Sequence, residues 1–148
     1  MKIGIGNDHR GFELKKQLVK YLENLGYEVI NYGSNSTESV DYPIYAFKVG
    51  EAIQKGEIDR GILICRTGIG MSIACNKVKK VRCAKIDNEE DAKLTRIDND
   101  SNVMAISYEK DIKEIEKIIK AFLETKFSEE ERHQRRIKMI DTYGEVWQ

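Results

Sequence analysis

The sequence lacks the features that mark several specialised classes of protein. It contains a single proline, Pro43, and no Ser/Gly-rich stretch that would separate one part of the chain from another. No apolar run approaches the length of a membrane span, and the first segment, MKIGIGNDH, has no signal-peptide pattern. We therefore expect one domain over residues 1–148, no contact with membranes and a cytoplasmic location.

Excess charge and metal-binding patterns are also missing. The 25 basic and 25 acidic residues give a formal net charge of zero, which argues against a nucleic-acid partner. The two histidines are too few for an ordinary metal cluster, and the three cysteines are odd in number. Because Cys65, Cys75 and Cys83 are spaced ten and eight apart, they suit neither a disulfide framework nor a zinc site. We predict no metal.

Short apolar runs alternate with longer segments of helical periodicity along the chain. The predicted strands are 2–6, 27–32, 60–65, 81–86 and 102–107. The predicted helices are 11–25, 42–55, 71–78, 88–97, 111–125 and 128–145. This alternation predicts an α/β fold whose five-stranded, mainly parallel sheet carries helices on both faces.

Ligands of such sheets bind beyond the carboxyl ends of the strands, near a switch point in strand order. This rule directs attention to three segments: NDH (7–9) after the first strand, CRTGIG (65–70) after the third, and TRIDNDSN (95–102) before the last. We expect these segments to mark the ligand site.

The most informative segment is CRTGIG, which joins a buried strand to a helix. Gly68 and Gly70 let the backbone turn sharply, so that its amides and the helix dipole form a site for an anion. A tight turn around a buried cysteine is the alternative. A thiol near a helix N-terminus ionises more readily than a free one, which singles out Cys65. We predict that Cys75 and Cys83 are core residues.

Polar residues of the other segments have two readings each. Asp8 and His9 follow the first strand and share an edge with Cys65, although Asp8 alone would suit a helix N-cap. The run from Asp98 to Asp100, just before the last strand, reads by itself as a polar turn.

The last helix carries a cluster of basic residues. Arg132 and Arg136 lie four apart, on one helix face, with His133 and Arg135 nearby. Two such arginines can hold a phosphate, or they can simply form a solvated face.

Taken together, five segments resemble the ribose-5-phosphate isomerase B family, which includes the two galactose-6-phosphate isomerase subunits. The resemblance covers nearly the whole chain, and the segments occur in the family's order. They are GNDHRG (6–11), SVDYP (39–43), GILICRTGIGMSIACNK (61–77), RIDNDSNV (96–103) and RHQRR (132–136).

The resemblance implies a Rossmann-like three-layer sandwich that needs neither cofactor nor metal. It also implies a homodimer with active sites that use residues of both subunits, and the choice between a dimer and a tetramer stays open. The C-terminal helix (about 128–145) is then expected at the dimer interface. The implied reaction converts ribose 5-phosphate into ribulose 5-phosphate by proton transfer between C1 and C2 through a cis-enediolate.

The resemblance also implies a role for each matching residue. Cys65 is the base that moves the proton between C2 and C1, and Asp8 assists proton movement between the two oxygens. Thr67 helps to open the furanose ring. The implied binding residues are Gly68, Gly70 and Asn99 at the enediolate, His9, Arg132 and Arg136 at the phosphate, and Tyr42.

Three positions depart from the family pattern. Asp98 stands where family members that act on ribose 5-phosphate carry the ring-opening histidine, and we retain Asp98 as its candidate replacement. Glu109 aligns with a phosphate-binding arginine, and Arg66 stands in place of a glycine. We predict that Arg66 offsets the missing arginine.

Two alternatives stay open at this point. The same chemistry could serve a six-carbon sugar phosphate, such as allose or galactose 6-phosphate, since the three departures could accommodate a longer substrate. The chain could also bind sugar phosphates without turnover. A nucleotide site is disfavoured, because both the GxGxxG fingerprint and the GxxxxGK[ST] loop are missing.

Overall fold

The computed structural model describes residues 1–145 and is built around one parallel sheet. Its strands are β1 (Lys2–Asn7), β2 (Glu28–Gly33), β3 (Arg60–Cys65), β4 (Cys83–Lys85) and β5 (Val103–Ser107). They lie in the order β2-β1-β3-β5-β4, and every neighbouring pair is parallel. The predicted α/β class and five-stranded sheet are confirmed.

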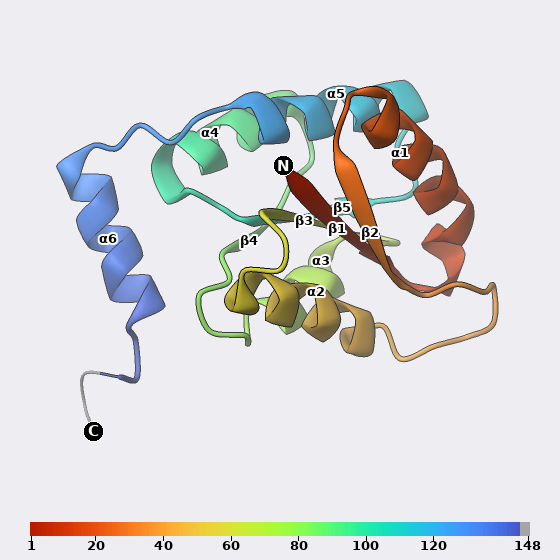
Figure 1. Cartoon of the computed structure of the whole chain (residues 1–148), viewed down its shortest axis with the longest axis horizontal. Coiled ribbons are helices and arrows are strands. Elements are labelled where there is room, and N and C mark those ends of the chain that lie inside the picture. Colours follow the sequence, from red (N-terminus) through yellow and green to blue (C-terminus); the bar gives the residue numbers. More distant parts are fainter. Residues whose placement is uncertain (146–148) are drawn as a thin grey trace.

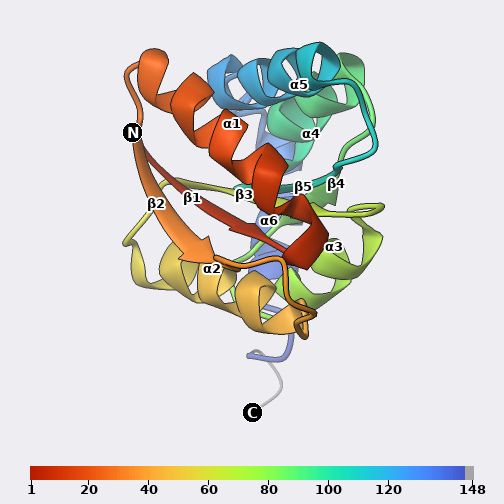
Figure 2. The same cartoon turned by 90° about the vertical axis from the view of Figure 1, so that its right-hand side faces the viewer.

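Helices cover both faces of this sheet. They are η1 (His9–Gly11, a 3-10 turn), α1 (Phe12–Asn24), α2 (Pro43–Lys55), α3 (Ile69–Cys75), α4 (Glu89–Asn99), α5 (Ile112–Glu124) and α6 (Glu131–Asp141). Figure 2 shows α1, α4 and α5 on one face and α2 with α3 on the other. In Figure 1, α6 stands away from these layers, beyond the end of α4.

Each face of the sheet has its own hydrophobic core, because neighbouring residues of a strand point to opposite faces. Ile62 and Ile64 of β3 pack with α1 and α5, whereas Leu63 and Cys65 pack with α2 and α3. Burying one such aliphatic side chain contributes about 1.5–3 kcal/mol. The alternation therefore fixes β3 in the centre and directs Cys65 to the α2–α3 side.

The strand order creates one switch point, between β1 and β3. From β1 the chain moves outward to β2, then returns to place β3 on the other side of β1. The connections leaving β1 and β3 consequently diverge at their carboxyl ends. This is the position where parallel sheets of this kind bind ligands, and both Asp8 and Cys65 lie there.

Several predicted boundaries were wrong by a few residues. The helix after β3 begins at Ile69 rather than residue 71, so that Gly70 belongs to its first turn. The next helix, α4, continues to Asn99 and ends at Asp100, whose φ of 45° is left-handed. Asp98 and Asn99 thus lie on a helix and not in a polar turn.

Within residues 1–145, no helix combines the length and the apolar character that crossing a membrane would require.

Candidate active site

The Cys65 thiol lies at the carboxyl end of the central strand and accepts a backbone hydrogen bond. Its side chain is 7% exposed, and the amide of Gly68 donates to Sγ over 3.1 Å. An N–H group directed at the sulfur stabilises negative charge there during proton transfer. The other two cysteines, Cys75 and Cys83, are buried core residues as predicted. A hydrogen bond with Cys75, followed by burial, raises the pKa of Cys83.

The turn after Cys65 requires glycine and leaves amides available. Gly68 has a φ of 80°, and a Cβ there would lie 3.1 Å from the backbone carbon and oxygen of Ala105. The Ile69 amide donates to Thr67 Oγ1 over 3.1 Å. Among residues 1–145, no acceptor takes the amides of Thr67 and Gly70. Two donors are therefore free near the thiol, as an anion site requires.

Tyr42 lies against this turn from the start of α2. A Cβ at Gly70 would approach Tyr42 Cζ and its hydroxyl to 2.7 Å each. The glycine therefore allows the phenol ring to lie directly on the first turn of α3. The candidate binding residues Tyr42, Gly68 and Gly70 therefore lie together at the turn after Cys65, and their binding roles stay predictions.

Asp8 and His9 stand at the end of β1, on the same edge of the sheet as Cys65. The Asp8 amide donates to the Ile64 carbonyl over 3.0 Å, which ties the β1 end to β3. One carboxylate oxygen, Oδ1, accepts from the Gly11 amide at 2.9 Å, so the N-cap reading of Asp8 is correct. Its Oδ2 has no hydrogen-bond partner within the described residues, nor does the buried His9 Nδ1. Within this part of the chain, Asp8 Oδ2 is therefore left without a partner at this edge, whereas the unpaired His9 Nδ1 is enclosed by protein.

Arg66 and Glu109 pair with each other on the other side of the turn. Arg66 Nε lies 3.1 Å from Glu109 Oε1. Ser107 braces the same loops, because its hydroxyl donates to the Arg66 carbonyl and accepts from the Glu109 amide. Arg66, Thr67 and Glu109 line an open pocket of about 370 Å³, together with Lys85 and Lys110.

Asp98 and Asn99 are far from Cys65 in the same chain, contrary to the prediction that TRIDNDSN shares its edge of the sheet. In the β3–β5 register, Val103 pairs with Gly61 and Ser107 with Cys65. Asn99 precedes Val103, and the strand from Gly61 to Cys65 adds about 13 Å at 3.3 Å per residue. Residues that precede a parallel strand lie at the amino ends of the strands. Asp98 and Asn99 therefore lie at the edge opposite Cys65, and the predicted edge was wrong.

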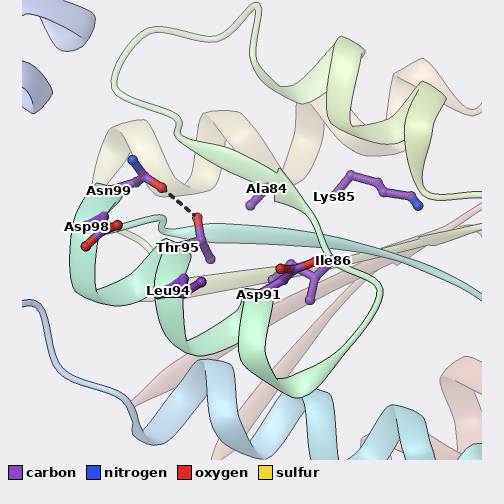
Figure 3. A pocket seen from close by; sticks show the side chains of 8 residues that line it. All are labelled: Ala84, Lys85, Ile86, Asp91, Leu94, Thr95, Asp98 and Asn99. Atoms are coloured by element: carbon purple, nitrogen blue, oxygen red, sulfur yellow. Dashed lines mark hydrogen bonds between the residues drawn. The ribbon is translucent and has the colours of Figure 1, made fainter.

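A second pocket, which shares Lys85 with the first, is lined by Asp98 and Asn99. It occupies about 260 Å³ between β4 and α4, with Lys85 at its other end, as Figure 3 shows. The Thr95 hydroxyl donates to Asn99 Oδ1 over 3.2 Å, which leaves the Asn99 amide group directed outward. The candidate residues of one chain therefore form two sets at opposite edges of the sheet.

The arginines of α6 belong to the second set. Arg132 and Arg136 are exposed on this helix, and Arg132 Nη2 pairs with Glu130 Oε2 at 3.1 Å. At the far end of the helix, Arg82 Nη1 donates to both carboxylate oxygens of Asp141, each at 2.8 Å. Figure 1 shows α6 beside α4, on the side of the molecule away from the carboxyl ends of β1 and β3.

Two residues with contacts at these sites received no role from the sequence. Ser107 follows the carboxyl-end rule, because it ends β5 next to Cys65, and that rule could have found it. His133 is buried and lies 3.6 Å from Asp98 through Nε2. The spacing within RHQRR gives no indication of this contact, which depends on how α6 packs on α4.

Within residues 1–145, no three His, Cys, Asp or Glu side chains gather in a way that could hold a metal ion. The absence of a metal from the reaction stays a prediction.

Comparison with known proteins connects this geometry with one family. The Ribose/Galactose Isomerase family model matches residues 3–140. Ribose-5-phosphate isomerase B of Escherichia coli (strain K12) is 44% identical over 140 residues, which cover 94% of this chain and 93% of the relative.

Solved structures agree with this match. Ribose-5-phosphate isomerase B of Clostridium thermocellum superimposes with a TM-score of 0.95 at 41% identity, over the full length of both chains. The enzyme from Mycoplasma genitalium, solved with bound ribulose-5-phosphate, gives a TM-score of 0.92 at 38% identity and covers 97% of this chain and 96% of its own.

Proposed function

The chain belongs to the ribose/galactose isomerase family, and we propose that it interconverts ribose 5-phosphate and ribulose 5-phosphate. It is an aldose–ketose isomerase, so the non-catalytic alternative is dropped. The named relatives act on ribose 5-phosphate, which favours a five-carbon substrate over allose or galactose 6-phosphate. The observation that carries the proposal is the Cys65 thiol beside the free amides of Thr67 and Gly70.

Cys65 acts as the base in this proposal. It removes the proton from C2 of the open-chain aldose and returns it to C1, while the carbonyl oxygen becomes an enediolate oxygen. The amides of Thr67 and Gly70 donate to that oxygen as its charge develops. Losing one such preorganised donor costs about 3–4 kcal/mol in related oxyanion sites. The Gly68 amide on Sγ supports the sulfur as it exchanges the proton.

Asp8 moves protons between O1 and O2 of the enediolate through its free Oδ2. His9 follows Asp8 at the end of β1, and we assign its imidazole to the phosphate of the same molecule. Both groups come from the end of β1, next to Cys65, so substrate bound at the switch point can reach all three.

We further propose that a second copy of the chain completes each site. Four candidate residues must contact the same substrate as Cys65. They are Asn99 at the enediolate, Asp98 at the ring, and Arg132 and Arg136 at the phosphate. The edge-to-edge separation within one chain supports a second copy as the source of these four residues. The position of α6 outside the layers of the sheet and its covering helices (Figure 1) suits a helix that reaches toward a partner. Assembly of dimers into tetramers and a cytoplasmic location stay predictions.

Proton NMR in heavy water tests the reaction. Purified protein with ribose 5-phosphate should yield ribulose 5-phosphate, with deuterium entering at the exchanging carbon. Cys65→Ala should abolish both signals, whereas Cys83→Ala, which removes another buried thiol, should retain them. If the wild-type chain produces neither ketose nor exchange, ribose 5-phosphate is not its substrate. If Cys65→Ala stays fully active, another group is the base.

A further inference from the structure

His133 is the buried residue of α6 and faces charged groups on two elements. Its side chain is 9% exposed. From α4, Asp98 Oδ1 lies 3.6 Å from its Nε2. From the start of α6, Glu130 Oε2 lies 3.8 Å from the same nitrogen, and Arg132 Nε donates to it over 3.4 Å. The proton on Nε2 therefore determines which of these three groups His133 pairs with.

Asp98 is the member of this group that lines a pocket. Its side chain is 44% exposed and lines the pocket of Figure 3 with Thr95 and Asn99. His133, being buried, contacts the carboxylate and leaves the pocket to it. The arrangement is a carboxylate at the surface of a pocket with an imidazole next to it.

The imidazole has two possible pairings. When it is neutral, Nε2 accepts from Arg132, so its proton is on Nδ1. When it is protonated, Nε2 becomes a donor to a carboxylate. Glu130 is already paired with Arg132 Nη2 at 3.1 Å, which leaves Asp98 as the acceptor. The protonation state of His133 therefore decides whether Asp98 has a cationic partner.

We propose that Asp98 and His133 form an acid–base couple that opens the sugar ring. Asp98 is the catalytic residue, and His133 is a positioning residue that shares a proton with it. This inference rests on the proposed function, because ring opening precedes isomerisation of the cyclic aldose and requires the site shared between two copies.

The couple holds one proton before and after the step. Asp98 gives the shared proton to the ring oxygen as the bond between that oxygen and C1 breaks. The proton of the C1 hydroxyl then passes to Asp98 as the C1 carbonyl forms. No other reactant is needed. An aspartate alone is ionised at neutral pH, and its pairing with His133 supplies the proton that it would otherwise lack.

Two measurements separate ring opening from the enediolate step. The first is kcat/KM for ribose 5-phosphate between pH 5 and 9. The second is the incorporation of deuterium at C1 of ribulose 5-phosphate in heavy water. That ketose is open-chain because its O5 carries the phosphate, so exchange at C1 needs Cys65 but no ring opening.

His133→Gln is the test variant. Glu130→Gln is its matched control, because Glu130 is the other carboxylate near His133 Nε2. We expect His133→Gln to lower conversion of ribose 5-phosphate about ten-fold, within the range of acid–base contributions, and to remove the change of rate between pH 5 and 8. Deuterium exchange should stay within about two-fold of wild type, since it bypasses the couple. Glu130→Gln should retain the wild-type pH profile.

A wild-type pH profile in His133→Gln would overturn the couple. Equal losses of conversion and exchange would also overturn it, because they indicate a structural role. If His133→Gln does not fold, Asp98→Asn, altered at an exposed side chain, receives the same two measurements. In Asp98→Asn, deuterium exchange at C1 must then be retained, while conversion of ribose 5-phosphate falls and its rate no longer changes with pH. Any other pattern overturns the couple. A wild-type chain that neither converts nor exchanges would instead refute the proposed function.

Discussion

Arg66 Nε and Glu109 Oε1 lie 3.1 Å apart, so two residues that depart from the family pattern neutralise each other. Both side chains are exposed, and an exposed ion pair contributes only about 0–1 kcal/mol to stability. The ion pair instead changes the charge of the pocket next to Cys65, which both residues line together with Thr67. A lone carboxylate at Glu109 would repel a phosphate, and Arg66 removes that repulsion.

Removing Arg66 should therefore weaken substrate binding. We expect Arg66→Gly to raise KM for ribose 5-phosphate about five-fold, the equivalent of 1 kcal/mol, with kcat little changed. The double variant Arg66→Gly/Glu109→Arg, which has the family's residues at both positions, should restore KM. Steady-state kinetics on the three proteins decides the matter. An unchanged KM in Arg66→Gly would show that the guanidinium does not contribute to binding.

Replacing Gly68 should damage catalysis and stability together. An alanine there combines a φ of 80° with a Cβ only 3.1 Å from the Ala105 backbone. We expect a loss of about 1–3 kcal/mol of unfolding free energy and a fall in kcat of at least about 100-fold as the amides move. Urea unfolding and initial rates measure the two effects.

Gly56→Ala is the matched control, because Gly56 has a φ of 74° and open space around the position of a Cβ. It should show the backbone strain alone, with a similar loss of stability and normal turnover. If Gly68→Ala were equally active, the Cys65 turn would not need its present geometry.

Lys15 should make stability depend on pH in alkaline solution. The side chain is 2% exposed, and Nζ donates to Asn31 Oδ1, Asn35 Oδ1 and the Ser34 carbonyl. Burial lowers the pKa of Lys15 from 10.5 to about 8. Between these values the unfolded chain retains a proton that the folded chain has lost, so the unfolding free energy rises with pH.

From pH 7.5 to 9.5, the wild-type protein should gain about 2 kcal/mol relative to Lys15→Met. Urea unfolding at the two pH values measures this difference. Lys16→Met, which removes an exposed neighbour, should follow the wild-type pH dependence. Parallel curves for wild type and Lys15→Met would mean that burial does not shift the pKa of Lys15.

The sequence predicted those features of the fold and site that depend on local pattern. The apolar run of residues 60–65 gave a central strand, and the two glycines after Cys65 gave a turn that directs an amide at the sulfur. Both follow from periodicity and backbone conformation, which a single segment contains. The polar residues after the first strand were assigned to the Cys65 edge for the same reason.

Features that depend on packing between distant segments could not be predicted in this way. The ion pair of Arg66 with Glu109 joins the ends of two strands, and the contact of His133 with Asp98 depends on the path of α6. The edge assignment of Asp98 and Asn99 failed because a carboxyl-end rule was applied to residues that precede a strand.

The separation of Cys65 from Arg136 predicts that inactive variants will restore each other. If each site takes Cys65 from one copy and Arg136 from the other, Cys65→Ala and Arg136→Ala homodimers both lack working sites. A mixed dimer contains one site with both natural residues and one site with neither. Random exchange of subunits in an equal mixture makes half of the dimers mixed, so activity should reach about a quarter of wild type.

The measurement is the initial rate after the two variants are unfolded and refolded together, compared with each variant refolded alone. A mixture of Cys65→Ala with Thr67→Ala serves as the control, because both changes fall in the same half of the site and cannot complement each other. Recovery in the first mixture alone would support a site shared between copies. If the first mixture stayed inactive, one chain would have to supply both residues, and α6 would then have to adopt a different position from the one in Figure 1.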